Sequence, residues 1–291
     1  MSPSCSKAFV LLVFAIGVCA TAFDGFAEEP TTESTSDLVL VSDVEWTPLN
    51  PARGDASPQA ATLWGDRAGT EATGFLVKFV DGFSSPPHIH NITYRGVVIA
   101  GGVHNDDPDA EPMWMHVGAF WTQPAGEPHI TAARGTTIAY IEIDKGPYLV
   151  MPTEEAFDNG ERPVNVDASN IVWLGQSSTS WIEPPAPSAT ANPSKIAFLW
   201  GNPQSDPVNG TLVKLPVGFV GKIRSQGSEF RAVVIEGQAN YRSNGIDNIK
   251  VMPPGSYFSS KGEMTHRVSC DDDTHCMIYV RSEGQFVVVP D

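Results

Sequence analysis

Residues 61–101 read ATLWGDRAGTEATGFLVKFVDGFSSPPHIHNITYRGVVIAG, and residues 197–237 read AFLWGNPQSDPVNGTLVKLPVGFVGKIRSQGSEFRAVVIEG. The two segments align without a gap at a constant offset of 136, and 15 of the 41 positions are identical. Self-similarity of this kind is the signature of a duplicated structural unit. The chain is therefore predicted to contain two copies of one unit of roughly 120 residues.

Two shorter matches extend the repeat toward the C-terminus. VGAFWTQPAGEPH (117–129) corresponds to PGSYFSSKGEMTH (254–266), and GPYLVMP (146–152) corresponds to GQFVVVP (284–290). Positions that both copies keep are expected to serve the fold. Positions that only one copy keeps are expected to serve a site.

The apolar residues of each unit come in short runs that are typical of β-strands. TGFLVKFV, GVVIAGGV and TTIAYIEI are rich in Val, Ile, Phe and Tyr, and Gly, Pro, Asn or Asp separate such runs. Long segments with a 3.6-residue period are absent. Many short strands in a unit of this size predict an all-β chain of two tandem barrels of the jelly-roll type.

The first 27 residues are interpreted as a secretory signal, because a lysine precedes an apolar run and small residues follow at suitable cleavage positions. The apolar run is roughly half of the ~20 residues that cross a bilayer. We therefore expect an exported, periplasmic or extracellular protein that does not span a membrane. The alternative is lipid attachment at Cys19, although Val18 is larger than the residue that usually precedes such a cysteine.

Composition and the repeat together predict the domain boundaries. A disordered lead-in is expected after the signal, followed by a barrel with the site, a linker and a barrel with a degenerate site. These segments are residues 28–37, 38–155, 156–168 and 169–291.

The formal net charge of -16 makes nucleic acid an unsuitable partner, because a phosphate backbone attracts basic surfaces. Exposed strand edges of the barrels would allow the protein to form a homodimer.

The mature chain keeps two cysteines, Cys270 and Cys276, on either side of an acidic turn between predicted strands. In an exported protein, such a pair could close a cross-strand disulfide. The alternative is a thiolate metal site in which His266 and His275 join the two cysteines.

The first copy contains a histidine pattern that is typical of a metal site. His88 and His90 are two positions apart on a predicted strand, so their side chains point to the same face. A tight turn at residues 124–126 then leads to His129 at the start of another strand.

These residues resemble the motifs of the cupins, in particular tandem bicupins of the bacterial domain-of-unknown-function type. The first cupin motif matches Gly82, His88, His90 and Gly101, and the second matches Gly118, Pro124, Gly126 and His129. The sequence departs from the family in two places, because Arg95 replaces the usual glutamate and Ala133 replaces the usual asparagine. The resemblance covers nearly the whole mature chain and implies a double-stranded β-helix for each copy.

The three histidines His88, His90 and His129 are predicted to hold one divalent metal. Neutral imidazoles suit Fe, Zn, Mn, Ni or Cu, and three of them leave coordination positions open. The resemblance implies that such a site is workable, since some cupin dioxygenases use three histidines. Without the glutamate, the ion keeps its full charge and should favour a small anionic ligand. The alternative is a set of pocket histidines that remain from a metal-binding ancestor.

The second copy holds Arg224 and Gln226 at the positions of His88 and His90, so we expect no metal there. Arg95 recurs as Arg231, which favours a structural salt bridge over its alternative role of binding a substrate carboxylate. Other candidates for lining a substrate pocket are Tyr94, Trp121 and Tyr140.

The leading hypothesis from the sequence is an exported small-molecule metalloenzyme, either dioxygenase-like or hydrolase-like. The alternative is a non-catalytic bicupin that binds or senses a carboxylate or sugar ligand. Turnover in the presence of metal separates these two hypotheses.

Overall fold

The computed structural model describes residues 1, 35–185, 193–203, 207–243, 248–271 and 273–291. Apart from Met1, the predicted signal segment 1–27 lies outside the described residues. Among the residues described, no helix has the length and apolar character needed to cross a membrane. The helices are short 3₁₀ turns: η1 (Pro51–Ala56), η2 (Thr153–Glu155) and η3 (Ala168–Asn170).

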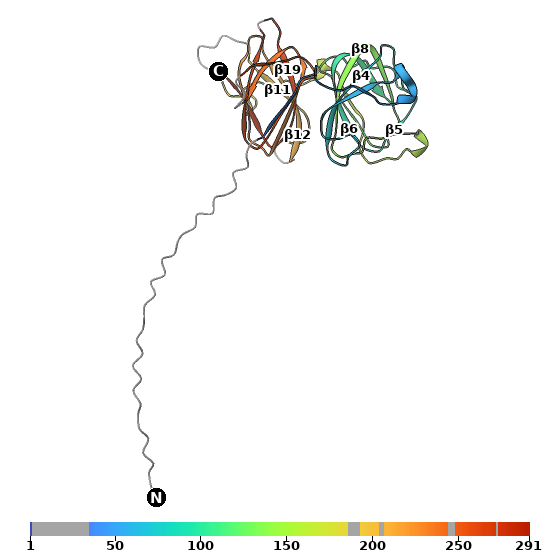
Figure 1. Cartoon of the computed structure of the whole chain (residues 1–291), viewed down its shortest axis with the longest axis horizontal. Coiled ribbons are helices and arrows are strands. Elements are labelled where there is room, and N and C mark those ends of the chain that lie inside the picture. The colour runs from blue at the N-terminus through green and yellow to red at the C-terminus, as the bar shows by residue number, and fades with distance from the viewer. Residues whose placement is uncertain (2–34, 186–192, 204–206, 244–247, 272) are drawn as a thin grey trace. The chain divides into compact units, whose positions relative to one another are not determined.

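The first barrel is built from a seven-stranded antiparallel sheet and a two-stranded sheet (Figure 1). The seven strands, in sheet order, are β10 (Val164–Val166), β7 (Phe120–Gln123), β6 (Tyr94–Asp106), β8 (Ile130–Ile143), β4 (Thr73–Phe79), β3 (Gln59–Trp64) and β2 (Thr47–Pro48). The small sheet pairs β5 (Ile89–His90) with β9 (Val150–Met151).

The long strands β6 and β8 bend where their pairing shifts register. The shifts lie between Val98 and Gly102, and Gly101 within them has a φ of 70° that favours glycine. Strand β6 pairs with β7 over Tyr94–Val97 and with β8 from Tyr94 to Asp106. Tyr94 at its start and Asn105 near its end are joined by a side-chain hydrogen bond.

The second barrel contains a six-stranded and a five-stranded antiparallel sheet. The order of the first sheet is β1 (Ser36–Val39), β17 (Tyr257–Lys261), β14 (Glu229–Glu236), β19 (Cys276–Glu283), β12 (Val208–Leu215) and β11 (Lys195–Trp200). The order of the second sheet is β16 (Lys250–Met252), β15 (Ala239–Ser243), β18 (Met264–Cys270), β13 (Val220–Ser225) and β20 (Phe286–Pro290). The expected all-β fold of two tandem jelly-roll barrels is therefore confirmed.

The repeated glycines explain part of the internal sequence identity. Gly74 and Gly210 occupy equivalent positions, and a Cβ on either one would overlap the indole of Trp64 or Trp200. Each indole then donates a hydrogen bond to a buried tyrosine, Tyr140 in the first barrel and Tyr279 in the second. The repeated glycines and tryptophans therefore serve the fold of both copies, as their repetition predicts.

Two edge strands depart from the boundaries that the sequence predicts. Residues 36–39 form β1, which pairs with β17 of the second barrel, although the sequence places residues 36–37 in the lead-in and residues 38–39 in the first barrel. Strand β10 falls within the expected linker 156–168 and pairs with β7. Both segments gain backbone hydrogen bonds by covering sheet edges that would otherwise be exposed.

The two barrels meet around a buried carboxylate, that of Glu142. The hydroxyl of Tyr279 and the guanidinium of Arg281 lie 2.8 and 3.2 Å from Glu142 Oε1, and the Tyr140 hydroxyl lies 3.1 Å from Oε2. Glu142 is 1% exposed, so nearly all of its hydrogen bonding comes from these groups. Arg281 also forms an ion pair with Asp144 at 2.8 Å.

A symmetric pair of arginines stacks across the same interface. Arg95 lies 3.9 Å from the ring centre of Trp200, and Arg231 lies 3.8 Å from the ring centre of Trp64. Each arginine therefore stacks on the tryptophan of the opposite barrel, at positions that correspond in the repeat. Desolvated stacking of this kind contributes more than an exposed ion pair does.

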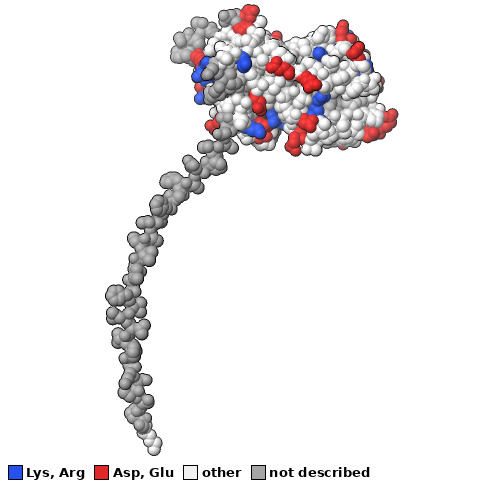
Figure 2. All heavy atoms as spheres, viewed as in Figure 1, with Lys and Arg blue, Asp and Glu red and all other residues white. Residues whose placement is uncertain are grey.

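The face drawn in Figure 2 shows acidic side chains scattered among fewer basic ones. The net charge of -16 is therefore not gathered into a single acidic patch on this face.

Candidate metal centre

The structure brings His88, His90 and His129 together. One potential ligand atom from each residue lies within 4.8 Å of the others. His88 and His129 face each other in a β-bridge, because the backbone N–H of each donates to the carbonyl of the other at 3.0 and 2.9 Å. His90 lies in β5, two residues further along the chain. His90 and His129 are buried, whereas His88 is partly exposed.

Each histidine ring is held in the same tautomer by a backbone carbonyl. The Nδ1 atoms of His88, His90 and His129 donate to the carbonyl oxygens of Pro86, Leu149 and Glu127 at 3.0, 2.9 and 3.1 Å. Because a carbonyl can only accept, the proton stays on Nδ1 and the lone pair stays on Nε2. Nδ1 hydrogen bonds of this type orient the imidazoles of metal sites.

Burial keeps the three rings neutral. It lowers the pKa of His88, and it lowers the pKa of His90 well below the ordinary value with help from the two neighbouring imidazoles. Burial also lowers the pKa of His129 to about 3, again with a contribution from His88. Metal binding requires neutral imidazole, so these rings need not release protons before they bind a cation at neutral pH.

Two tyrosine hydroxyls lie beside the histidine Nε2 atoms. The Tyr94 hydroxyl is 3.3 Å from Nε2 of His129, and the Tyr148 hydroxyl is 3.3 Å from Nε2 of His90. The Tyr148 ring also stacks on His90, with ring centres 4.4 Å apart and an interplanar angle of 22°. Tyr94 was predicted from the sequence, whereas Tyr148 was not.

A chain of hydrogen bonds fixes the direction of the Tyr94 hydroxyl. Gln123 Nε2 donates to the Glu127 carbonyl at 3.1 Å, and Asn105 Nδ2 donates to Gln123 Oε1 at 2.9 Å. Asn105 Oδ1 therefore faces Tyr94, whose hydroxyl donates to it at 2.9 Å. The single proton of Tyr94 is thus engaged, and the lone pairs of its oxygen are directed away from Asn105.

Of the other candidate residues, Trp121 lies nearest to the histidines. It is buried in the core of the first barrel against Gly96, where a Cβ would overlap its ring, and its indole lies beside the Tyr94 hydroxyl. Tyr140 and Arg95 lie elsewhere. Tyr140 donates to Glu142 at the interface between the barrels. Arg95 points away from the histidines because neighbouring side chains on a strand alternate, and it pairs with Asp144 at 2.8 Å. For Arg95, the geometry matches the salt bridge and not the pocket role.

The corresponding site in the second barrel is filled by internal hydrogen bonds. Nδ1 of His266 lies 2.9 Å from the Tyr241 hydroxyl, and Nε2 lies 3.0 Å from the Ser260 hydroxyl. Arg224, at the position of His88, forms an ion pair with Glu183. Within the described part of the chain, the second barrel offers no group of three metal-ligating side chains.

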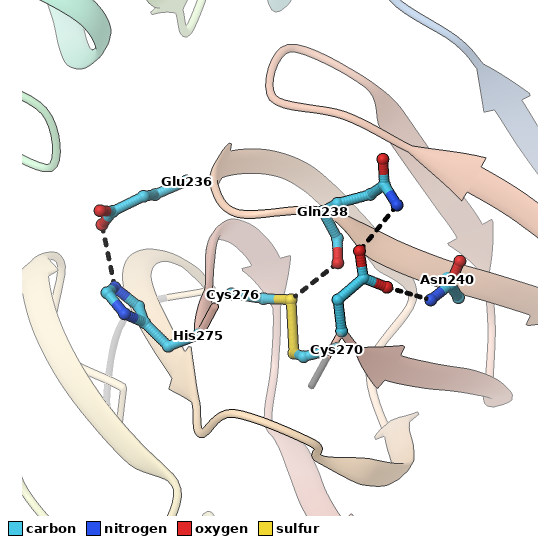
Figure 3. Close-up of a disulfide and its surroundings, with 7 residues drawn as sticks. Glu236, Gln238, Asn240, Cys270, His275 and Cys276 are labelled. Carbon is cyan, nitrogen blue, oxygen red and sulfur yellow. Dashed lines mark hydrogen bonds and ion pairs between the residues drawn. A yellow bond between two sulfur atoms is a disulfide. The ribbon is translucent and has the colours of Figure 1, made fainter. Parts of the chain in front are cut away.

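Figure 3 shows the disulfide that joins Cys270 to Cys276, whose Cα atoms are 5.9 Å apart. The alternative thiolate site is not assembled, because His275 pairs with Glu236 at 3.0 Å and His266 has the partners described above. The neighbouring loop is held by Asp271, which accepts hydrogen bonds from Gln238 and Asn240 at 2.8 and 2.9 Å.

The buried side chain of His266 is expected to make the folded protein less stable in acid. Burial lowers its pKa to about 3, whereas an unfolded histidine has a pKa of about 6.5. Below pH 6.5 the unfolded chain takes up a proton that the folded chain does not accept until about pH 3. We expect the free energy of unfolding to fall over this window, with about 2–3 kcal/mol from this residue by pH 4.5.

Urea unfolding of the protein with a chelator, at pH 7.5 and pH 4.5, tests this expectation. In the His266→Gln variant, the difference between the two pH values should shrink by about that amount. An unchanged difference would show that His266 does not contribute to acid sensitivity.

The internal repeat also carries a signal for Tyr148. Tyr148 in GPYLVMP corresponds to Phe286 in GQFVVVP. A hydroxyl that is kept only in the copy with three histidines would have identified this residue.

The family model described as "Domain of unknown function (DUF4437)" matches residues 37–289. No curated protein matches the chain. The match to the family model covers both barrels, and the description of the family names no reaction.

Several solved structures have a similar fold at low sequence identity. A dioxygenase-like protein from Nostoc punctiforme has a TM-score of 0.61 at 14% identity, over 86% of this chain and 83% of that one. The oxalate decarboxylase of Lactobacillus farciminis, in a formate complex, has a TM-score of 0.55 at 11% identity, over 86% and 88%. AerE from Microcystis aeruginosa has a TM-score of 0.52 at 9% identity, over 84% and 97%. These neighbours establish the cupin fold.

Proposed function

The chain belongs to the DUF4437 family, and from its bicupin fold and histidine cluster we propose that it is an exported small-molecule metalloenzyme. His88, His90 and His129 hold one divalent transition metal through their Nε2 atoms. When bound, the metal supplies Lewis acidity or, if it is iron, redox chemistry with O₂.

The observation that carries this proposal is the hydrogen-bonding pattern that the three rings share. Each Nδ1 proton is donated to a carbonyl, so three lone pairs remain directed to one small region. By contrast, both ring nitrogens of His266 in the second barrel are engaged by hydroxyl groups, so this histidine has no free lone pair for a metal. The first barrel therefore keeps a set of ligands that the second barrel has replaced.

The donor set also indicates the kind of ligand. Three neutral imidazoles add no negative charge, so a divalent ion keeps its full charge and attracts an anionic oxygen ligand. The oxalate decarboxylase of Bacillus subtilis has Mn(II) centres, and the enzyme from Lactobacillus farciminis binds formate. These neighbours support a carboxylate or enolate as the class of substrate, on the basis of a shared fold.

The disulfide supports export. Disulfides such as that of Cys270 and Cys276 persist in oxidising compartments and are rare in the cytosol. The signal segment proposed for residues 1–27 would direct the mature chain to the periplasm or to the exterior.

Elemental analysis of the mature chain, residues 28–291 without a histidine tag, tests the proposal. We expect close to one equivalent of a transition metal in the wild type and almost none in the His88→Ala/His90→Ala variant. Oxygen uptake with iron or copper, or hydrolysis with zinc, is then measured against a panel of small carboxylates and enols.

Two outcomes would contradict parts of the proposal. A protein that stays metal-free after reconstitution would exclude the metalloenzyme. A metal-loaded protein that is thermally stabilised by a ligand without turning it over would instead be a binding or sensing module.

A further inference from the structure

The two tyrosines beside the histidines lose their hydroxyls in the second barrel. Tyr94 corresponds to Phe230, and Tyr148 corresponds to Phe286. The rings keep the same arrangement, because their centres are 5.8 Å apart at 84° in the first barrel and 5.7 Å apart at 78° in the second. The ring pair therefore serves the fold of both barrels. The two hydroxyls are present only in the barrel that has the three clustered histidines.

The hydroxyl of Tyr148 has one hydrogen-bond partner among the described residues, which is Nε2 of His90. Nε2 carries a lone pair, since Nδ1 donates to the Leu149 carbonyl, so the Tyr148 hydroxyl is the donor in this contact. A metal bound at Nε2 takes that lone pair. The Tyr148 proton is then left beside the metal, available to another acceptor.

The segment that carries Tyr148, residues 146–151, is fastened over His90 and is called the strap below. The side chain of Asn91 donates to the Pro147 carbonyl at 3.0 Å and accepts from the backbone N–H of Leu149 at 2.9 Å. The β5–β9 pairing joins His90 to Val150 on the same segment. The strap therefore holds the Tyr148 hydroxyl at a fixed place relative to His90.

We propose that Tyr148 is a ligand-positioning residue, whose hydroxyl donates a hydrogen bond to an anionic oxygen bound beside the metal. This inference rests on the proposed metal site and deepens it. The proton that Tyr148 gives to His90 in the metal-free site passes to the ligand when metal occupies Nε2. The site thereby favours small anionic ligands that can accept this hydrogen bond.

Tyr94 has a different role, because its proton is already given to Asn105. Its oxygen can only accept within the site, so it does not assist an anion. The two hydroxyls are therefore not interchangeable. Only Tyr148 should contribute to anion affinity.

The test uses the mature chain loaded with Co(II), with azide as the anionic probe and visible absorption of the cobalt as the readout. We expect Tyr148→Phe to keep the wild-type cobalt content and to bind azide about tenfold more weakly, because a hydrogen bond to a charged acceptor is lost. The variant should fold, since the second barrel carries Phe286 at this position. Asn91→Ala, which loosens the strap and keeps the hydroxyl, should weaken azide binding to a smaller extent.

Tyr241→Phe is the matched control. It removes a hydroxyl that contacts a buried histidine in the other barrel, and it should leave azide affinity unchanged. Unchanged azide affinity in a cobalt-loaded Tyr148→Phe protein would overturn this inference alone. Loss of cobalt in that variant would also overturn it, because the hydroxyl would then hold the metal. A wild type that takes up no cobalt would overturn both this inference and the proposed function.

Discussion

Replacing His129 by alanine is expected to lower the affinity for a divalent metal by more than about a hundredfold, since even residues that only orient a metal ligand contribute 10–100-fold. His129 is 0% exposed, and its ring lies 4.2 Å from that of His88 and 5.3 Å from that of His90, between ring centres. Its removal leaves two imidazoles, which are too few for a high-affinity site.

Competition with a chromophoric chelator measures this change. His116→Ala is the matched control, because His116 is an exposed histidine of the same barrel and lies outside the cluster. If both variants bind metal as the wild type does, the cluster is not the metal site. If both lose affinity to the same extent, the loss does not report on the cluster.

Replacing Glu142 by leucine is expected to destabilise the whole chain by about 3–5 kcal/mol. The carboxylate is buried between the barrels, and its removal leaves Arg281 with Asp144 as its remaining acidic partner. Burial and the neighbouring carboxylate raise the pKa of Tyr140 and of Tyr279, so both keep their protons and lose an acceptor. Unpaired buried donors carry the full cost of desolvation.

Chemical denaturation of Glu142→Leu, Arg281→Leu and the double variant measures the coupling. The double variant should recover part of the loss, because two leucines leave no unpaired charge in the pair itself. Additive losses would show that the two groups do not stabilise each other. If either single variant loses less than about 1 kcal/mol of the free energy of unfolding, this pair contributes no more than an exposed salt bridge does.

The fold could be predicted from the sequence because a comparison of the two copies shows which positions both of them keep. Gly74 and Gly210 are kept since each admits a tryptophan ring, and Arg95 and Arg231 are kept since each stacks on the opposite barrel. The repeated residues are therefore those that pack within each barrel or lie at the interface between the two barrels. The convergence of His88, His90 and His129 followed from strand alternation and from one tight turn.

The rest of the site depends on contacts that strand periodicity does not encode. The bend of β6 brings Asn105 back to Tyr94 over 11 residues, and Asn91 holds a strap that lies 58 residues away in the chain. Tyr140 was expected in the pocket, but its side chain faces the second barrel, where its ring centre lies 5.4 Å from that of Tyr279. Periodicity tells which residues share a face, and it does not tell which neighbour that face covers.

Strand β1 is synthesised before both barrels, but it can only assemble after its partner strand has been made. The first strand of the described fold pairs with β17, which the ribosome makes more than two hundred residues later. The edge of the second barrel's sheet therefore stays uncovered until both segments are available, however early the first barrel closes. A protease cut in the connector between the barrels would not yield two self-sufficient halves, because the strand that completes the second barrel would remain attached to the first.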